Sequence, residues 1–407
     1  MRWALRIAIA VFVVLAGIIG VLVYVSRPAE PGHFYATPSE LPTKPGAVIR
    51  SKGFDQGVPA GAEAHLIMYT TTIATGEQRV ATATVLVPKA RPKGNGAHPV
   101  LAWAHGTTGI VPGCAPSLLS EPWGGIPALG AVLKAGYVVV ATDYVGLGTK
   151  GPHEYLVGDT AARNVLDSIR ALHAYDAADD VTHGVGLTDE TVVWGHSQGG
   201  QTTLFTGQIA KEYAPDVDIV GLGALSPPAH LSALLVAEKD STVGKVLSSL
   251  AIESWSHVYH DIDFDDIVRP AARPVARRIA GRCLTEPAAF LTILEGLSLR
   301  GSILKVDPAT YRPLVRRMEQ NSAKGEIPFP LFIGQGAADE VVAPKVTETY
   351  VDELCRKGQD LDFHLLPGIG HLGIVEEGSP IDAPLLAWTA DRFAGERVPA
   401  GCHRHDG

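Results

Sequence analysis

The residues Gly195-His196-Ser197-Gln198-Gly199 form a pattern that could support nucleophilic chemistry. A serine hydroxyl becomes a nucleophile when it lies on a tight turn between a strand and a helix and a base takes its proton. The run Thr191 to Trp194 predicts a buried strand before Ser197, and Gln198 to Tyr213 predicts a helix after it. The flanking glycines allow strand and helix to approach closely. The pentapeptide alone is weak evidence, and an ordinary glycine-rich turn with a bystander serine is the alternative.

A serine of this kind needs a base and a carboxylate, which follow it along the chain in the order Ser, Asp or Glu, His. A predicted buried strand ends shortly before Asp339 and Glu340. We predict Asp339 as the carboxylate, with Glu340 as the alternative. His371 lies between glycine-containing segments just after the strand predicted over Leu361 to Leu366, so we predict it as the base. His364 falls inside that strand pattern and is predicted to be structural.

The negative oxygen of a tetrahedral intermediate requires two backbone N–H donors. One is expected from Gln198, directly after the nucleophile. The strand predicted over Val100 to Ala104 leads into a loop of small residues that contains Thr107 and Thr108. The second donor is expected from one of these two threonines, and the sequence does not choose between them.

The charge balance argues against nucleic-acid binding, and the context of one glycine motif argues against a nucleotide cofactor. Acidic residues outnumber basic ones, 43 to 34, and the formal net charge is −9, so the basic face that nucleic-acid binding requires is not expected. Gly146 to Gly151 matches G-x-G-x-x-G after a predicted strand, but the chain continues as a loop instead of opening a helix. We therefore predict no nucleotide cofactor and no other cofactor.

The first 26 residues predict export. Arg2 and Arg6 precede the uncharged apolar stretch Ile7 to Val25, and a helix of this length reaches about 28 Å, close to the bilayer core. No small-residue cleavage site follows the stretch. We predict residues 1–26 to be a membrane anchor, with a cleaved signal sequence as the alternative, and the rest of the chain to be extracytoplasmic.

The four cysteines are widely separated and contain no C-x-x-C pair, so they do not predict a zinc site. In an oxidising compartment an even number of cysteines predicts two disulfides, with buried free thiols as the alternative. Spacing alone leaves three pairings open. The four positions are Cys114, Cys283, Cys355 and Cys402.

Strands and helices alternate along much of the chain, which predicts an α/β fold with a mostly parallel central sheet. Residues 27–60 are rich in proline and glycine and are predicted to be an extended linker. The core is expected in two parts, residues 61–228 and 325–402. Between them, residues 229–324 have a helical pattern and predict a helical cap inserted between nucleophile and acid.

Several segments together resemble the secretory lipase family, which includes actinobacterial and fungal lipases. The resemblance covers roughly residues 35–402 and implies an α/β-hydrolase fold, a helical cap and a triad of Ser197, Asp339 and His371. It also implies disulfides Cys114–Cys283 and Cys355–Cys402. The segments that carry it are Trp103 to Gly109, Cys114 to Ser117, Thr142 to Gly148, His153 to Leu156, the serine pentapeptide, Gly336 to Val342 and Gly370-His371.

The function expected from these features is hydrolysis of carboxylic esters, especially lipid esters, through an acyl-enzyme and without a metal ion. Fold and triad do not fix the substrate, so a peptidase or an acyltransferase is an alternative. A surface protein without catalytic activity is a weaker alternative, because all three triad positions are filled.

Overall fold

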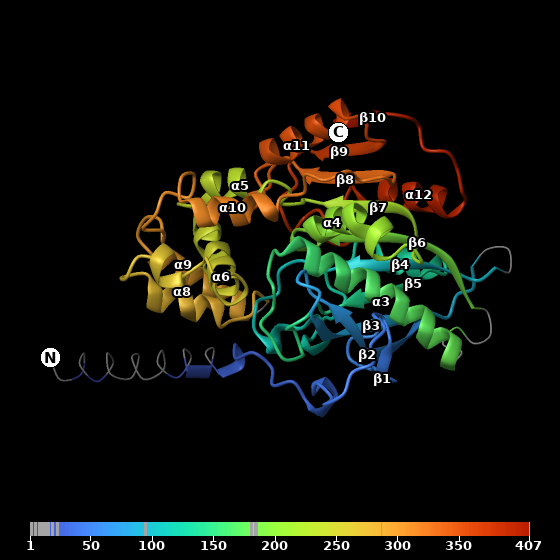
Figure 1. Ribbon diagram of the computed structural model, residues 1–407, viewed down its shortest axis with the longest axis horizontal. Coiled ribbons are helices and arrows are strands. Elements are labelled where there is room, and N and C mark those ends of the chain that lie inside the picture. Colours follow the sequence, from blue (N-terminus) through green and yellow to red (C-terminus); the bar gives the residue numbers. More distant parts are fainter. Residues whose placement is uncertain are drawn as a thin grey trace.

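A single large sheet organises the protein. The structure is a computed structural model that describes residues 24–92, 96–179, 186–285 and 287–406, together with residues 3, 6, 17, 20, 21 and 182. Within these residues the sheet has ten strands in the order β1-β2-β3-β5-β4-β6-β7-β8-β9-β10 (Figure 1). The strands are β1 (Val48–Gly53), β2 (Ala62–Thr72), β3 (Gln78–Pro88), β4 (His98–Ala104), β5 (Val138–Thr142), β6 (Leu187–His196), β7 (Asp218–Leu225), β8 (Leu331–Gly336), β9 (Leu361–Leu366) and β10 (Cys402–Asp406).

From β5 to β10 all neighbouring strands are parallel, whereas β1, β2 and β3 are antiparallel to their neighbours. This confirms the predicted mostly parallel sheet. Helices α3 (Gly158–Asp179), α4 (Gln198–Tyr213) and α11 (Pro344–Arg356) pack on one face. Helices α2 (Leu129–Lys134) and α12 (Asp382–Phe393) pack on the other. Because both faces are covered, central strands such as β5 are buried along their whole length.

The chain between β7 and β8 folds as helices with a hydrophobic core of their own, which includes Leu250, Trp255 and Ile279. This helical segment occupies the stretch for which an insertion is predicted, and Figure 1 shows it beside one end of the sheet. Its helices are α5 (Leu231–Glu238), α6 (Thr242–Val258), α7 (Phe264–Ile267), α8 (Arg273–Ala280), α9 (Ala288–Ser298) and α10 (Arg312–Gln320).

The prediction of an extended linker over residues 27–60 is wrong for much of that stretch. Strand β1 extends the sheet by pairing with β2. Tyr35, at the end of the short helix η1 (His33–Tyr35), is buried, and its hydroxyl group forms a 2.8 Å hydrogen bond with Ser117 Oγ. Phe54 packs edge-on against Trp123. The prediction rests on the proline and glycine content and overlooks these few apolar side chains. Their burial offsets the entropy lost when this part of the chain becomes ordered.

Most of the predicted anchor, residues 1–26, lies outside the described residues. Among the helices that the structure does describe, none is long and apolar enough to span a bilayer.

One disulfide and a buried carboxylate hold loops at the carboxyl ends of the strands, and a second disulfide lies at the opposite end, where β9 and β10 begin. Cys114, in the short helix η2 (Pro112–Cys114), is bonded to Cys283, and Cys355 is bonded to Cys402. This is the pairing that the family resemblance implies.

The buried carboxylate is Asp143, which follows β5. It accepts hydrogen bonds from Ser117 N (2.9 Å), Ser117 Oγ (2.6 Å) and Thr82 Oγ1 (2.5 Å). Burial raises the pKa of Asp143 to about 6, although these hydrogen bonds favour its charged form. Ser117 lies in the short helix η3 (Pro116–Leu118), so Asp143 ties the chain that follows β5 to the chain that follows β4.

Candidate active site

Ser197 lies on the turn between β6 and α4, in a backbone conformation that side chains rarely adopt. Its φ is 55° and its ψ is −121°. Such a conformation costs on the order of 1–3 kcal/mol and persists only where the surroundings enforce it. The N–H of Ser197 donates to the carbonyl oxygen of Leu225 at the end of β7 (2.9 Å), and the carbonyl of Ser197 accepts from Gln201 N (3.1 Å). The neighbouring strand and the first turn of α4 therefore hold the turn from both sides.

The two glycines of the motif make this turn sterically possible. A Cβ atom at Gly195 would lie 2.1 Å from the carbonyl oxygen of Gly199, and one at Gly199 would lie 1.8 Å from that of Ala104, at the end of β4. No side chain fits at such distances. The loop after β4 also packs against this turn, because a Cβ at Gly106 would lie 3.3 Å from His196 Nδ1 and 3.7 Å from Ser197 Cβ.

Asp339 and His371 are hydrogen-bonded to each other, with 2.8 Å between Asp339 Oδ2 and His371 Nδ1. They follow β8 and β9, which lie next to each other in the sheet. Asp339 Oδ1 accepts from the backbone N–H groups of Val341 (2.9 Å) and Val342 (2.8 Å). Burial raises the pKa of Asp339, but the hydrogen bonds from His371 and from the two valines outweigh it and lower the pKa overall. Asp339 is thus an ionised carboxylate aimed at an imidazole.

Glu340, the alternative carboxylate, has a different contact. Its Oε2 accepts from the backbone N–H of His371 (3.3 Å), whereas the ring of His371 bonds to Asp339. The structure therefore distinguishes the two acids, because one contacts the imidazole and the other holds the loop that carries it.

His196, the residue before Ser197, contacts His371 and so links the nucleophile turn to the histidine loop. The rings of His196 and His371 are 4.6 Å apart, and His196 Nε2 donates to the carbonyl oxygen of His371 (2.9 Å). Burial lowers the pKa of His196 to about 3, so this ring is neutral and has one N–H to donate. Among the described residues Ser197 Oγ forms no hydrogen bond with His371. Such bonds are often long in unliganded enzymes and shorten when substrate binds.

Sequence reasoning missed two supporting residues. His196 occupies the first x position of the G-x-S-x-G motif, and its ring donates a hydrogen bond to the backbone carbonyl of His371. Gln335 donates from Nε2 to Asp339 Oδ2 (3.0 Å) and accepts from Thr347 Oγ1 (2.8 Å). The only sequence signal for Gln335 is a buried polar residue at the end of an apolar strand.

Gln198 and the threonine loop lie on the other side of Ser197. Gln198 Nε2 donates to His153 Nε2 (3.1 Å), and His153 Nδ1 donates to the carbonyl of Val145 (2.9 Å). This pattern fits a neutral ring, since burial lowers the pKa of His153 to about 4. Thr107 Oγ1 is hydrogen-bonded to Tyr155 OH (2.9 Å). Within the described residues the backbone N–H groups of Gln198, Thr107 and Thr108 have no backbone acceptor, so they remain available.

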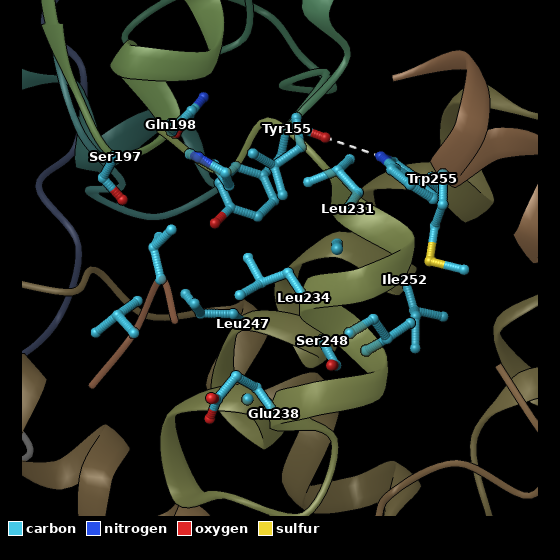
Figure 2. A pocket seen from close by; sticks show the side chains of 18 of the residues that line it. Tyr155, Ser197, Gln198, Leu231, Leu234, Glu238, Leu247, Ser248, Ile252 and Trp255 are labelled. Carbon is cyan, nitrogen blue, oxygen red and sulfur yellow. Dashed lines mark hydrogen bonds between the residues drawn. The ribbon is translucent and has the colours of Figure 1, made fainter. Parts of the chain in front are cut away.

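A pocket of about 780 Å³, its open mouth included, adjoins Ser197. Figure 2 shows the hydroxyl of Ser197 pointing into it, with side chains of α5 and α6 opposite. Val341 and Val342 also line the pocket, which connects it to the Asp339 loop. Its apolar wall includes Leu231, Leu234, Leu235, Leu247, Ala251, Ile252, Trp255, Leu314 and Met318.

Replacing Gly199 by alanine tests the packing at the turn. We expect Gly199→Ala to lower the free energy of unfolding by about 3 kcal/mol, because its Cβ would overlap the backbone of β4. Thermal or denaturant unfolding measures the loss. Gly130→Ala in α2 is the matched control, since a Cβ there has no atom within 4 Å, and its stability should be unchanged or slightly higher. Equal stability of the two variants would contradict this packing.

Comparison with known proteins identifies the family. The family model described as "Secretory lipase" matches residues 127–401. A secreted triacylglycerol lipase of Malassezia globosa is 26% identical over 84% of this chain and 75% of its own length. A protein of Mycobacterium tuberculosis named a probable inactive lipase is 25% identical over 93% of this chain and 85% of its own. The crystal structure of Candida antarctica lipase A matches with a TM-score of 0.75 at 22% identity, over 93% of this chain and 90% of its own.

The structural match confirms the α/β-hydrolase fold, and the family match confirms the resemblance noted in the sequence. The family model covers about two thirds of the chain, from the approach to α2 up to the start of β10. The chain therefore belongs to the secretory lipase family.

Proposed function

We propose that this protein hydrolyses carboxylic esters of lipids, with Ser197 as nucleophile, His371 as base and Asp339 as the carboxylate that orients it. The observation that carries the proposal is the hydrogen-bonded pair Asp339–His371. This pair follows the carboxyl ends of strands β8 and β9, at the same end of the sheet as the strained turn at Ser197. This combination fits nucleophilic catalysis and no other chemistry that the described residues offer nearby.

In the proposed reaction Ser197 Oγ attacks the ester carbonyl carbon. With Nδ1–H donated to Asp339, the neutral ring of His371 has a free lone pair on Nε2, which takes the serine proton and passes it to the leaving alcohol. Water, activated in turn by His371, then hydrolyses the acyl-enzyme and restores the serine. The negative charge on Asp339 stabilises the imidazolium that forms in each half of the reaction.

For the oxyanion we propose the backbone N–H groups of Gln198 and Thr107. Gln198 lies at the first turn of α4, where N–H groups lack helical partners and the helix dipole favours negative charge. Thr107 follows Gly106, which packs against Ser197, and its hydroxyl is held by Tyr155 in the pocket wall. Thr108 is held instead towards the cap, because its carbonyl oxygen accepts from Leu284 N (2.8 Å).

Two features support a lipid substrate. The pocket beside Ser197 is lined mainly by apolar side chains and suits an acyl chain. Apolar side chains are also exposed at the surface: Leu372, next to His371, is 64% exposed, and α9, in the helical segment between β7 and β8, carries Phe290, Ile293 and Leu297 at its surface. Exposed apolar patches of this kind mark surfaces that meet lipid or protein. The relative named a secreted triacylglycerol lipase agrees with this substrate class.

We further propose that the protein acts outside the cytoplasm. Its two disulfides suit an oxidising compartment. Residues 1–26 would serve as a membrane anchor or as a cleaved signal sequence, and N-terminal sequencing of the exported protein separates the two.

One relative is named a probable inactive lipase, so membership of the family does not by itself establish catalysis. We expect Ser197→Ala to lower kcat for p-nitrophenyl butanoate by about 10⁴-fold or more, because the nucleophile is removed. Ser248→Ala is the matched control, since Ser248 lines the same pocket and has no role in the proposed chemistry (Figure 2). Wild-type protein without esterase activity, or a Ser197→Ala variant that keeps it, would overturn the proposal.

The acyl pocket makes a second prediction. Leu234 lies in the pocket wall opposite Ser197, next to the labelled side chain of Leu247 on α6 (Figure 2). Leu234→Trp should fill that space and lower kcat/KM for p-nitrophenyl hexadecanoate, relative to the acetate, by about tenfold or more. Thr349→Trp, at an exposed position on α11 that does not line the pocket, should leave the ratio unchanged. If Leu234→Trp also leaves it unchanged, the acyl chain binds elsewhere.

A further inference from the structure

The opposite end of the sheet from β1 carries a cluster of metal-ligating side chains. β10 is the edge strand there and pairs in parallel with β9, with His405 directly opposite His364. Asp362 precedes His364 by two residues on β9 and so lies on the same face of the sheet. Figure 1 shows these two strands at the border of the sheet, with β8 and β7 next to them. The sequence predicts no metal ligands here, because only this strand pairing brings the three residues together.

The three side chains converge on one carboxylate oxygen. Asp362 Oδ1 lies 2.6 Å from His405 Nε2 and 3.5 Å from His364 Nε2. Ligand atoms of the three residues all lie within 4.8 Å of one another. The two imidazole rings are stacked nearly parallel, with centroids 4.3 Å apart and an interplanar angle of 15°. Phe332 stacks on the other side of His364 at 4.7 Å and restricts the orientation of that ring.

We propose that Asp362, His364 and His405 bind a zinc ion. Two imidazole nitrogens and one carboxylate oxygen are a ligand set that zinc prefers, with water in the fourth position. Ligand atoms about 2.1 Å from a tetrahedral zinc lie about 3.4 Å apart. The distance from Asp362 to His364 already matches this spacing, and the shorter distance to His405 must open by less than an ångström.

The burial of the cluster suits an ion that enters from solvent. The side chains of His364 and Asp362 are 13% and 29% exposed, whereas that of His405 is 52% exposed. Two ligands are thus held by their surroundings, and the third can swing to admit the ion. Asp362 also attracts the buried guanidinium of Arg392 on α12, so part of its negative charge is already balanced. We therefore expect moderate affinity, well below that of a zinc finger.

The ion would fasten the last strand to the sheet. β10 makes its ladder with β9 and is also attached through the disulfide Cys355–Cys402 at its first residue and through an ion pair between Arg404 and Asp352 on α11. A zinc ion bound to His405, three residues further along, would secure the other end of the strand. Its role would be structural, and no step of the proposed ester hydrolysis depends on it.

Calorimetric titration with zinc chloride tests the site, using full-length protein in detergent without a histidine tag and after treatment with a chelator. We expect one ion per chain, binding at least about tenfold weaker in His405→Ala, and a zinc-dependent rise in Tm that this variant loses. His405 is half-exposed, so the variant should fold, which circular dichroism checks. His257→Ala is the matched control: its side chain is 59% exposed and faces Glu253 at 3.4 Å, as His405 faces Asp362.

The control should bind zinc as the wild type does. Absence of saturable binding to the wild type would overturn the proposal, as would equal affinity in His405→Ala. If His257→Ala weakened binding as much as His405→Ala, zinc would be binding to surface histidines in general and the assigned site would be wrong. Full esterase activity in His405→Ala is expected in every case, so this test is independent of the proposed function.

Discussion

The close approach of three backbone segments around Gly195 and Gly199 is the constraint on which the site depends. The end of β4, the turn after β6 and the first turn of α4 meet there at distances that exclude any Cβ atom. This packing forces Ser197 into a strained conformation and leaves its side chain at the end of the sheet, facing the pocket (Figure 2). This conformation costs on the order of 1–3 kcal/mol, and the hydrogen bond from Ser197 to Leu225 and the packing of the surrounding core offset that cost.

The strand order converts this local turn into a site. Because β6, β7, β8 and β9 are adjacent and parallel, the loops that follow them all lie at the carboxyl end of the sheet. Asp339 and His371 are therefore brought together although 32 residues separate them along the chain. Backbone donors, Gln335 and the carbonyl-bound His196 then fix their orientation. The helical segment between β7 and β8 adds the apolar wall opposite Ser197.

The parts of this arrangement that could be predicted are those that leave a local trace in the sequence. A strand followed by a glycine-flanked serine, by an acid or by a glycine-flanked histidine can be recognised without knowing what lies nearby. The contact of Tyr35 with Ser117 spans 82 residues, and that of His196 with His371 spans 175. Such contacts depend on the whole fold, so the N-terminal strand and the support of His371 were beyond prediction. The choice between Thr107 and Thr108 likewise rests on a contact with a distant segment, at Leu284.

We propose Ser197 as the nucleophile of a working hydrolase. The most direct measurement is to incubate the folded protein with a fluorophosphonate, determine the intact mass and locate the modification by peptide mapping. We expect one phosphonyl group per chain, carried by Ser197, and no modification of heat-unfolded protein, in which Asp339 and His371 no longer assemble around the serine. Failure of the folded protein to react, or modification at another residue, would contradict it.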